Sequence, residues 1–118
     1  MAEYHLRPRR PATPALSTAF GSAGGTACDR SLAELLLEAA RRHPRYAPVL
    51  DGRFKGGYIT RRYGRPAEGV HAIQLELSQR TYMNEDYPYS FDEGLAAALR
   101  PVLTEMLGAV RSWLEASL

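Results

Sequence analysis

Glu76 is the carboxylate whose position in the sequence most suggests contact with a ligand. It stands near the end of the apolar run Val70–Ser78, whose alternating pattern predicts a strand. One face of that strand carries His71, Ile73, Leu75 and Leu77, and the other carries Val70, Ala72, Gln74, Glu76 and Ser78. The second face begins apolar and becomes polar toward its carboxyl end, where open α/β sheets bind ligands. Glu76 is therefore either a ligand-contacting group or an exposed charge at the sheet edge.

Two further stretches have the chemistry to bind an anion. Five basic residues and no acid lie between positions 53 and 65, namely Arg53, Lys55, Arg61, Arg62 and Arg65. Arginine binds carboxylates or phosphates bidentately, so this is a candidate anion site, with a solvated loop as the alternative. The glycine-rich stretch 19–26 offers backbone N–H groups to an anion. No P-loop lysine follows it, which leaves an ordinary loop as its other interpretation.

Composition excludes several classes of protein. A single cysteine, Cys28, rules out an internal disulfide or a multi-cysteine metal site, and it is expected to be a buried loop thiol. The three histidines stand too far apart for a local metal motif. No apolar stretch is long enough to span a membrane, and no signal peptide is visible, so a cytoplasmic protein is expected. At 118 residues the chain is one domain, short for a self-contained α/β enzyme.

The elements that must position these groups indicate an α/β fold. Residues 1–18 are rich in proline and arginine and predict a flexible leader, followed by one domain over 19–118. A helix is predicted from the N-cap Asp29 to just before Pro44, with a capping box of Ser31 and Glu34 as the alternative start. A strand is predicted near 58–61. A long amphipathic helix follows a capping box at residues 90–93, and Pro101 is expected to kink or split it.

Three strings of residues resemble the C-terminal half of the N-formylglutamate amidohydrolases, also called N-formylglutamate deformylases. They are DGRFKGGYITRRYGRP at 51–66, GVHAIQLEL at 69–77 and QRTYM at 79–83. Residues 24–29 also resemble the family's loop before its helix. The resemblance covers residues 21 to the C-terminus, with Arg62 standing where the family usually has histidine. The family's N-terminal half, with its metal-binding His and acidic residues, has no counterpart here.

This resemblance implies a partial zinc-peptidase-like, three-layer α/β/α architecture, as in phosphorylase/hydrolase-like folds, with the N-terminal half missing. It implies metal-dependent hydrolysis of N-formyl-L-glutamate to L-glutamate and formate, a step in histidine degradation. Glu76 is then the catalytic proton acceptor and donor. Arg61 is the expected carboxylate clamp, with Lys55 and Arg53 as second choices. Gln74 orients the substrate or Glu76, or makes a structural hydrogen bond. His71 polarises the amide carbonyl, binds metal or is a hydrogen-bonded core histidine.

The resemblance also implies zinc or a similar divalent metal for the full domain, although this chain shows no recognisable set of ligands. Only His5 and Glu3 stand in the leader as possible ligands. We therefore expect the chain alone to be weakly active or inactive. The alternatives are a non-catalytic, arginine-rich module for carboxylates, with nucleic acid disfavoured by the acidic C-terminal half, or a module that self-associates through an exposed sheet edge or apolar helix face.

Overall fold

The computed structural model describes residues 16–118, which form a three-stranded sheet and three α-helices. The strands are β1 (Thr18–Gly21), β2 (Pro48–Leu50) and β3 (Gln74–Leu77), in the order β2-β1-β3. β1 runs parallel to β2 and antiparallel to β3. The predicted α/β class is confirmed. The leader predicted over 1–18 lies mostly outside the described residues, but its last residue, Thr18, begins the central strand and is fully buried.

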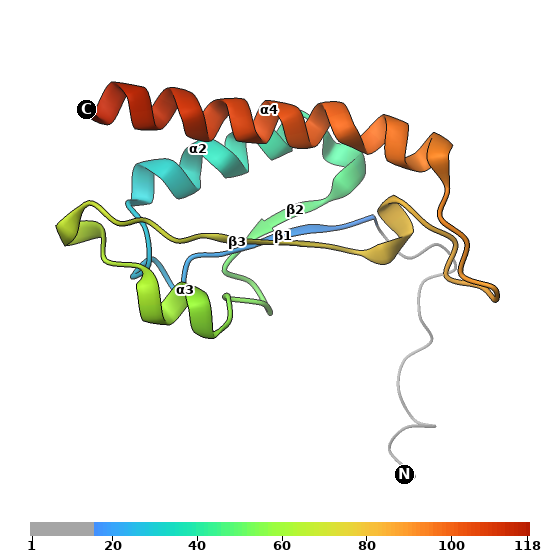
Figure 1. Ribbon diagram of the computed structural model, residues 1–118, viewed down its shortest axis with the longest axis horizontal. Coiled ribbons are helices and arrows are strands. Elements are labelled where there is room, and N and C mark those ends of the chain that lie inside the picture. Colours follow the sequence, from blue (N-terminus) through green and yellow to red (C-terminus); the bar gives the residue numbers. More distant parts are fainter. Residues whose placement is uncertain (1–15) are drawn as a thin grey trace, which may run out of the picture.

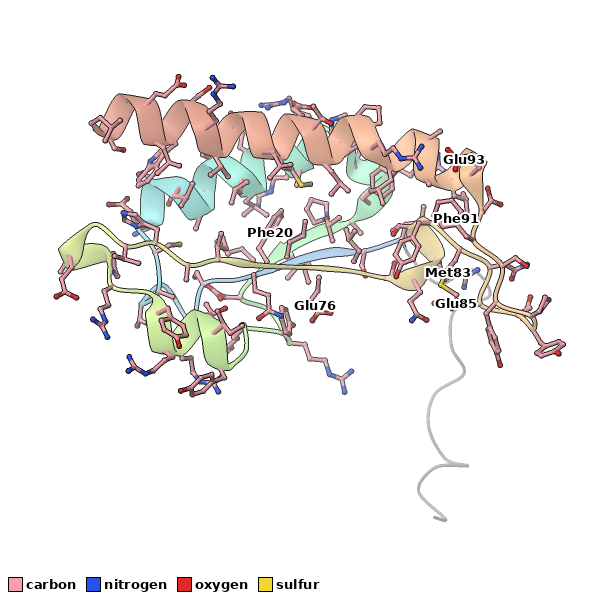
Figure 2. All side chains as sticks on the ribbon, viewed as in Figure 1. Phe20, Glu76, Met83, Glu85, Phe91 and Glu93 are labelled. Atoms are coloured by element: carbon pink, nitrogen blue, oxygen red, sulfur yellow. The ribbon has the colours of Figure 1, made fainter. Side chains whose placement is uncertain are left out.

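Two long helices cover one face of the sheet (Figure 1). They are α2 (Arg30–Arg41) and α4 (Glu93–Ser117), and a hydrophobic core lies between them and the strands. Phe20 points from β1 into this core (Figure 2). The short helix α3 (Tyr58–Tyr63) lies on the other side of the sheet. Three single turns of 3-10 helix occupy the connections, at Pro44–Tyr46, Pro66–Glu68 and Gln79–Thr81.

Both long helices begin at aspartates, α2 at the predicted Asp29 and α4 at Asp92 instead of Ser90, the first residue of the predicted capping box. Asp29 Oδ1 accepts a hydrogen bond from Ser31 N at 2.8 Å, which confirms the predicted N-cap of α2. Asp92 caps α4 by accepting from Leu95 N at 2.9 Å. Pro101 lies inside α4, yet the helix continues over 25 residues, so of the two outcomes expected at this proline, a kink or a split, the split is wrong. Packing of the apolar face against α2 and the sheet outweighs the one lost backbone hydrogen bond.

The predicted strand at 58–61 is wrong, because these residues belong to helix α3. Gly56, with φ of 101°, adopts a left-handed conformation just before the helix and breaks an extended path there. Thr60 is the one buried residue of this helix, and Ile59 is 70% exposed. Tertiary contacts, and not the β propensity of its branched side chains, therefore decide the structure of this segment.

The predicted strand over 70–78 is shorter in the structure, where only Gln74–Leu77 forms β3. Val70, expected to be covered, is 48% exposed and pairs with Arg65 in an isolated bridge across a turn. The alternation itself is confirmed within β3. Leu75 is paired with Phe20 and Leu77 with Thr18 on the helix-covered face, whereas Gln74 and Glu76 lie on the opposite face.

Glu105 joins α4 to the C-terminal end of α2. It accepts hydrogen bonds from Arg42 Nε at 2.6 Å and pairs with His43 Nε2 at 2.6 Å. The hydrogen bonds from His43 and then Arg42 hold the pKa of the Glu105 carboxyl below its ordinary value of 4.5. A carboxyl whose pKa is lowered on folding adds stability above its unfolded-state pKa, and this is lost as pH falls through the folded-state pKa.

We expect Glu105→Gln to remove part of the acid sensitivity of folding. Urea unfolding midpoints of the wild type and the variant will differ at neutral pH and converge as pH falls through the lowered pKa of Glu105. Glu115→Gln is the matched control, because Glu115 pairs with Arg111 on the exposed end of the same helix. Equal loss of stability on acidification in wild type and Glu105→Gln would contradict the assignment.

Candidate functional site

Gln74 connects strand β3 to the beginning of helix α3. Its Oε1 accepts hydrogen bonds from Gly57 N at 2.8 Å and from Thr60 Oγ1 at 3.4 Å. Its Nε2 donates to Glu76 Oε1 at 3.4 Å. No side chain within α3 caps the helix, so Gln74 supplies the acceptor that its first turn needs. The same amide orients the carboxylate of Glu76.

Glu76 is exposed on the sheet face that α2 and α4 do not cover (Figure 2). It lies opposite Ala19 of the central strand. The sequence predicted Glu76 at the end of the sheet where the carboxyl ends of strands bind ligands. That placement needs correction, because β3 is antiparallel to the other two strands. The carboxyl ends of β1 and β2 meet at the end of the sheet where Gln74 begins β3, and Glu76 lies two residues further from that end. Glu76 instead faces an open polar surface beside α3.

The cationic segment is held against the sheet by a close backbone approach at Gly21. A Cβ atom added to Gly21 would lie 2.3 Å from Gly56 N and 2.4 Å from Lys55 C. Arg61 Nη1 donates to Gly56 O at 3.2 Å, so the guanidinium lies beside the turn that Gln74 contacts. The structure thus connects Glu76, Gln74 and Arg61 through one turn. Lys55 and Arg53 precede this turn, and both side chains are exposed.

The glycine-rich loop does wrap an anion, and that anion is the chain's own Asp51. Asp51 Oδ1 accepts from Ser22 N at 2.7 Å and from Gly24 N at 3.4 Å, while Oδ2 accepts from Ser22 Oγ. Ala23, Gly24 and Gly25 all have positive φ, which turns successive N–H groups inward. Asp51 was missed as a site-building residue. The sequence signal for Asp51 was its position directly after the apolar residues of β2. Because β2 runs parallel to β1, this position brings Asp51 beside the loop that follows β1.

His71 lies on the opposite face from Glu76. Its Nδ1 accepts a hydrogen bond from Asp29 N at 2.9 Å, and its ring packs edge-to-face on Trp113 at a centroid distance of 4.8 Å. His71 and Gln74 both border an open hollow of about 720 Å³ between α3 and the end of α4, and Glu76 is not part of its lining. The structure therefore separates His71 from Glu76, although His71 shares this hollow with Gln74, and gives it contacts typical of a structural histidine.

Cys28 is buried, as predicted, with 1% of its surface exposed. Burial raises the pKa of its thiol, and the nearby carboxylates of Asp51 and Asp29 raise it further. A thiol in such surroundings stays protonated near neutral pH and is a poor nucleophile.

The family resemblance implies a zinc ion, which needs a cluster of suitable side chains. Between positions 16 and 118 there is no group of three or more His, Cys, Asp or Glu side chains placed to hold a metal ion. Since zinc takes three or four protein ligands, the described part of the chain does not fit this metal. Residues Glu3 and His5, the possible ligands of the leader, lie outside the described residues.

No helix over 16–118 is both long and apolar enough to cross a bilayer.

Comparisons with known proteins agree on one family. A family model described as N-formylglutamate amidohydrolase matches residues 1–83, which include the turn around Gly56 and both Gln74 and Glu76. N-formylglutamate deformylases of Pseudomonas putida and Pseudomonas aeruginosa are 47% and 46% identical to the chain over 94 residues. The crystal structure of an N-formylglutamate amidohydrolase from Ralstonia eutropha JMP134 superposes with a TM-score of 0.73 at 25% identity.

This chain therefore belongs to the N-formylglutamate amidohydrolase family. The curated matches cover 80% of the chain but only 35% of each relative, and the structural match covers 99% of the chain and 40% of the solved protein. The chain thus spans about a third of the length of the curated relatives. The match to the family model covers residues 1–83 of the chain. The resemblance seen in the sequence instead began near Gly21 and continued to the C-terminus.

Proposed function

We propose that this chain carries the acid–base and substrate-binding part of a metal-dependent N-formylglutamate deformylase. The reaction would convert N-formyl-L-glutamate and water to L-glutamate and formate, as a cytoplasmic step of histidine degradation within a three-layer, zinc-peptidase-like domain. The observation that carries the proposal is the hydrogen-bonded connection from Glu76 through Gln74 to the turn that holds Arg61. The names of the relatives support the substrate.

In this proposal Glu76 accepts a proton from the water that attacks the formyl carbon. As the carbon–nitrogen bond breaks, the same carboxyl returns the proton to the departing amino nitrogen. Gln74 Nε2 holds the carboxylate in place, and Arg61 binds a carboxylate of the substrate, with Lys55 and Arg53 near the second. Because the described residues do not fit zinc, no step is assigned to the metal, and we expect tight stoichiometric zinc binding to be absent from the chain alone.

Formate release, followed by proton NMR, tests the catalytic half of the proposal. We expect slow turnover of N-formyl-L-glutamate by the purified chain. The rate should fall by at least about 10²-fold in Glu76→Gln, because glutamine keeps the size of the side chain but cannot accept the proton. Glu85→Gln, a change of the same kind outside the group around Gln74, is the control. Substrate binding without any formate release would contradict hydrolysis by this chain and favour a non-catalytic carboxylate-binding module.

Binding tests the role of Arg61 separately. We expect N-formyl-L-glutamate to shift the amide NMR signals of Gly57 and Gln74, and Arg61→Gln to weaken its affinity about tenfold, because a charge-assisted hydrogen bond is worth about 1.5–3 kcal/mol. Arg30→Gln is the matched control, since Arg30 pairs with Glu34 on the exposed face of helix α2. If Arg61→Gln and Arg30→Gln bound N-formyl-L-glutamate with equal affinity, Arg61 would not be part of the binding site.

A further inference from the structure

The peptide unit between Lys55 and Gly56 is fixed in position by the loop that follows β1. Its carbonyl oxygen, Lys55 O, accepts a hydrogen bond from Ala23 N at 2.8 Å. The same peptide packs directly on Gly21, where an added Cβ would meet its carbon and nitrogen atoms. The next carbonyl oxygen, Gly56 O, accepts from Arg61 Nη1 at 3.2 Å. The position of the Arg61 guanidinium therefore depends on the loop around Ala23.

Ala23 makes its bond to Lys55 O in a conformation that alanine does not favour. Its φ of 54° lies in the left-handed region, which an alanine keeps only where its surroundings impose it. The side chain of Asp51 imposes it here. Asp51 Oδ1 accepts from Ser22 N at 2.7 Å and from Gly24 N at 3.4 Å, so one carboxylate oxygen binds the N–H groups on either side of Ala23.

Asp51 is able to impose this conformation because its own backbone is fixed by the sheet. Asp51 N donates to Phe20 O at 2.8 Å, which continues the parallel pairing of β1 with β2. The second carboxylate oxygen, Oδ2, accepts from Ser22 Oγ, and this hydroxyl oxygen in turn accepts from Gly25 N at 3.0 Å. The carboxylate thus connects the ends of two parallel strands to every residue of the loop from Ser22 to Gly25.

We propose that Asp51 is a positioning residue for the binding of a substrate carboxylate by Arg61. The side chain of Asp51 fixes the loop, Ala23 N fixes the peptide between Lys55 and Gly56, and Gly56 O fixes the guanidinium. Asp51 itself does not contact the substrate. This role rests on the function proposed above for Arg61, and it adds a residue outside the cationic segment on which that function depends.

This arrangement predicts an effect on substrate binding and not on proton transfer. Glu76 stands on β3, and its backbone pairs with Ala19 of β1 and not with the loop. Loss of the Asp51 carboxylate should therefore raise KM for N-formyl-L-glutamate in the formate-release assay. It should leave kcat within about twofold, which is the pattern of a lost contact that substrate and transition state share.

A double-mutant cycle of Asp51→Asn and Arg61→Gln tests the coupling, with affinity measured by NMR titration with N-formyl-L-glutamate. We expect Asp51→Asn alone to weaken the affinity about threefold, which corresponds to one neutral hydrogen bond. In the Arg61→Gln background the same change should weaken it by less than about 1.5-fold, because the group that Asp51 positions is gone. Additive effects of the two substitutions would overturn the proposal.

Amide hydrogen exchange of Ala23 gives a readout that needs no substrate. We expect the exchange to be at least about tenfold faster in Asp51→Asn than in the wild type. Val102→Ala is the control for a loss of stability alone, since Val102 is 3% exposed in the core and its substitution should leave the affinity unchanged.

Two outcomes separate this role from the function on which it rests. A wild-type chain that binds no N-formyl-L-glutamate would overturn the function proposed for Arg61, and the positioning role with it. Normal binding by the wild type, with unchanged exchange of Ala23 or unchanged affinity in Asp51→Asn, would overturn the positioning role alone.

Discussion

Gly21→Ala will destabilise the fold by about 3 kcal/mol, an effect at the upper end for a single added methyl group. The new Cβ would lie 2.3 Å from Gly56 N and 2.4 Å from Lys55 C, and all the atoms that it meets first are backbone. Backbone cannot rotate away as a flexible side chain does, so either β1 or the turn at residues 55–57 must move. Chemical denaturation followed by circular dichroism measures the loss.

Gly108→Ala is the control for this substitution, because a Cβ at Gly108 meets nothing within 4 Å. Gly108 lies inside α4, where alanine is favoured over glycine, so the variant should be more stable by about 0.5–1 kcal/mol. Opposite signs of the two changes would show that the close approach at Gly21, and not the loss of a glycine, is responsible. Similar stabilities of Gly21→Ala and the wild type would contradict the described packing of the turn on β1.

Asp51→Ala will cost about 4 kcal/mol, because it combines two separate losses. Ser22 is 1% exposed, and its N–H and hydroxyl would both lose their charged acceptor in a place that water does not reach. In addition, Asp51 has φ of 48°, a left-handed conformation that aspartate and asparagine tolerate better than alanine does. Urea denaturation at neutral pH measures the change.

Asp51→Asn separates these two contributions. The amide oxygen can still accept from Ser22 N, and asparagine tolerates the backbone conformation, so we expect a loss of only about 1–2 kcal/mol. Amide hydrogen exchange of Gly24 and Gly25 should rise in both variants, and more in Asp51→Ala. Equal stability of Asp51→Ala and Asp51→Asn would show that the carboxylate does not hold the loop.

Sequence alone predicts the parts of this fold in which local signals and packing agree. Helix α2 begins at its expected cap, and the apolar and polar faces of β3 are those that alternation indicates. The central strand was missed because Thr18–Gly21 is only four residues long and follows a proline-rich stretch. A strand this short is specified by the strands that pair with it on both sides, β2 and β3, and both lie far from β1 along the chain. Helix α3 was mistaken for a strand because its β-branched residues outweigh its weak helical pattern.

The candidate site was predictable in composition but not in arrangement. Alternation placed Glu76 and Gln74 on one face, and that face is the open one. Nothing local shows that β3 runs antiparallel to β1, so the end of β3 that lies beside the carboxyl ends of the parallel strands was assigned incorrectly. The contact between the turn at Gly56 and Gly21 joins residues 35 positions apart, and it follows only from the assembled sheet. His71 precedes β3 and lies on the opposite face from Glu76, as the alternation of the predicted strand indicated.

The order of the strands has a consequence for synthesis on the ribosome. The central strand is made first, yet both of its partners come later: β2 begins 27 residues after β1 ends (48 minus 21), and β3 begins 53 residues after it (74 minus 21). At about 10 residues per second, β1 waits roughly 5 s for its second neighbour. During that interval the nascent chain presents Phe20 without its core, so we expect chaperones that bind exposed apolar segments to engage this protein early in translation.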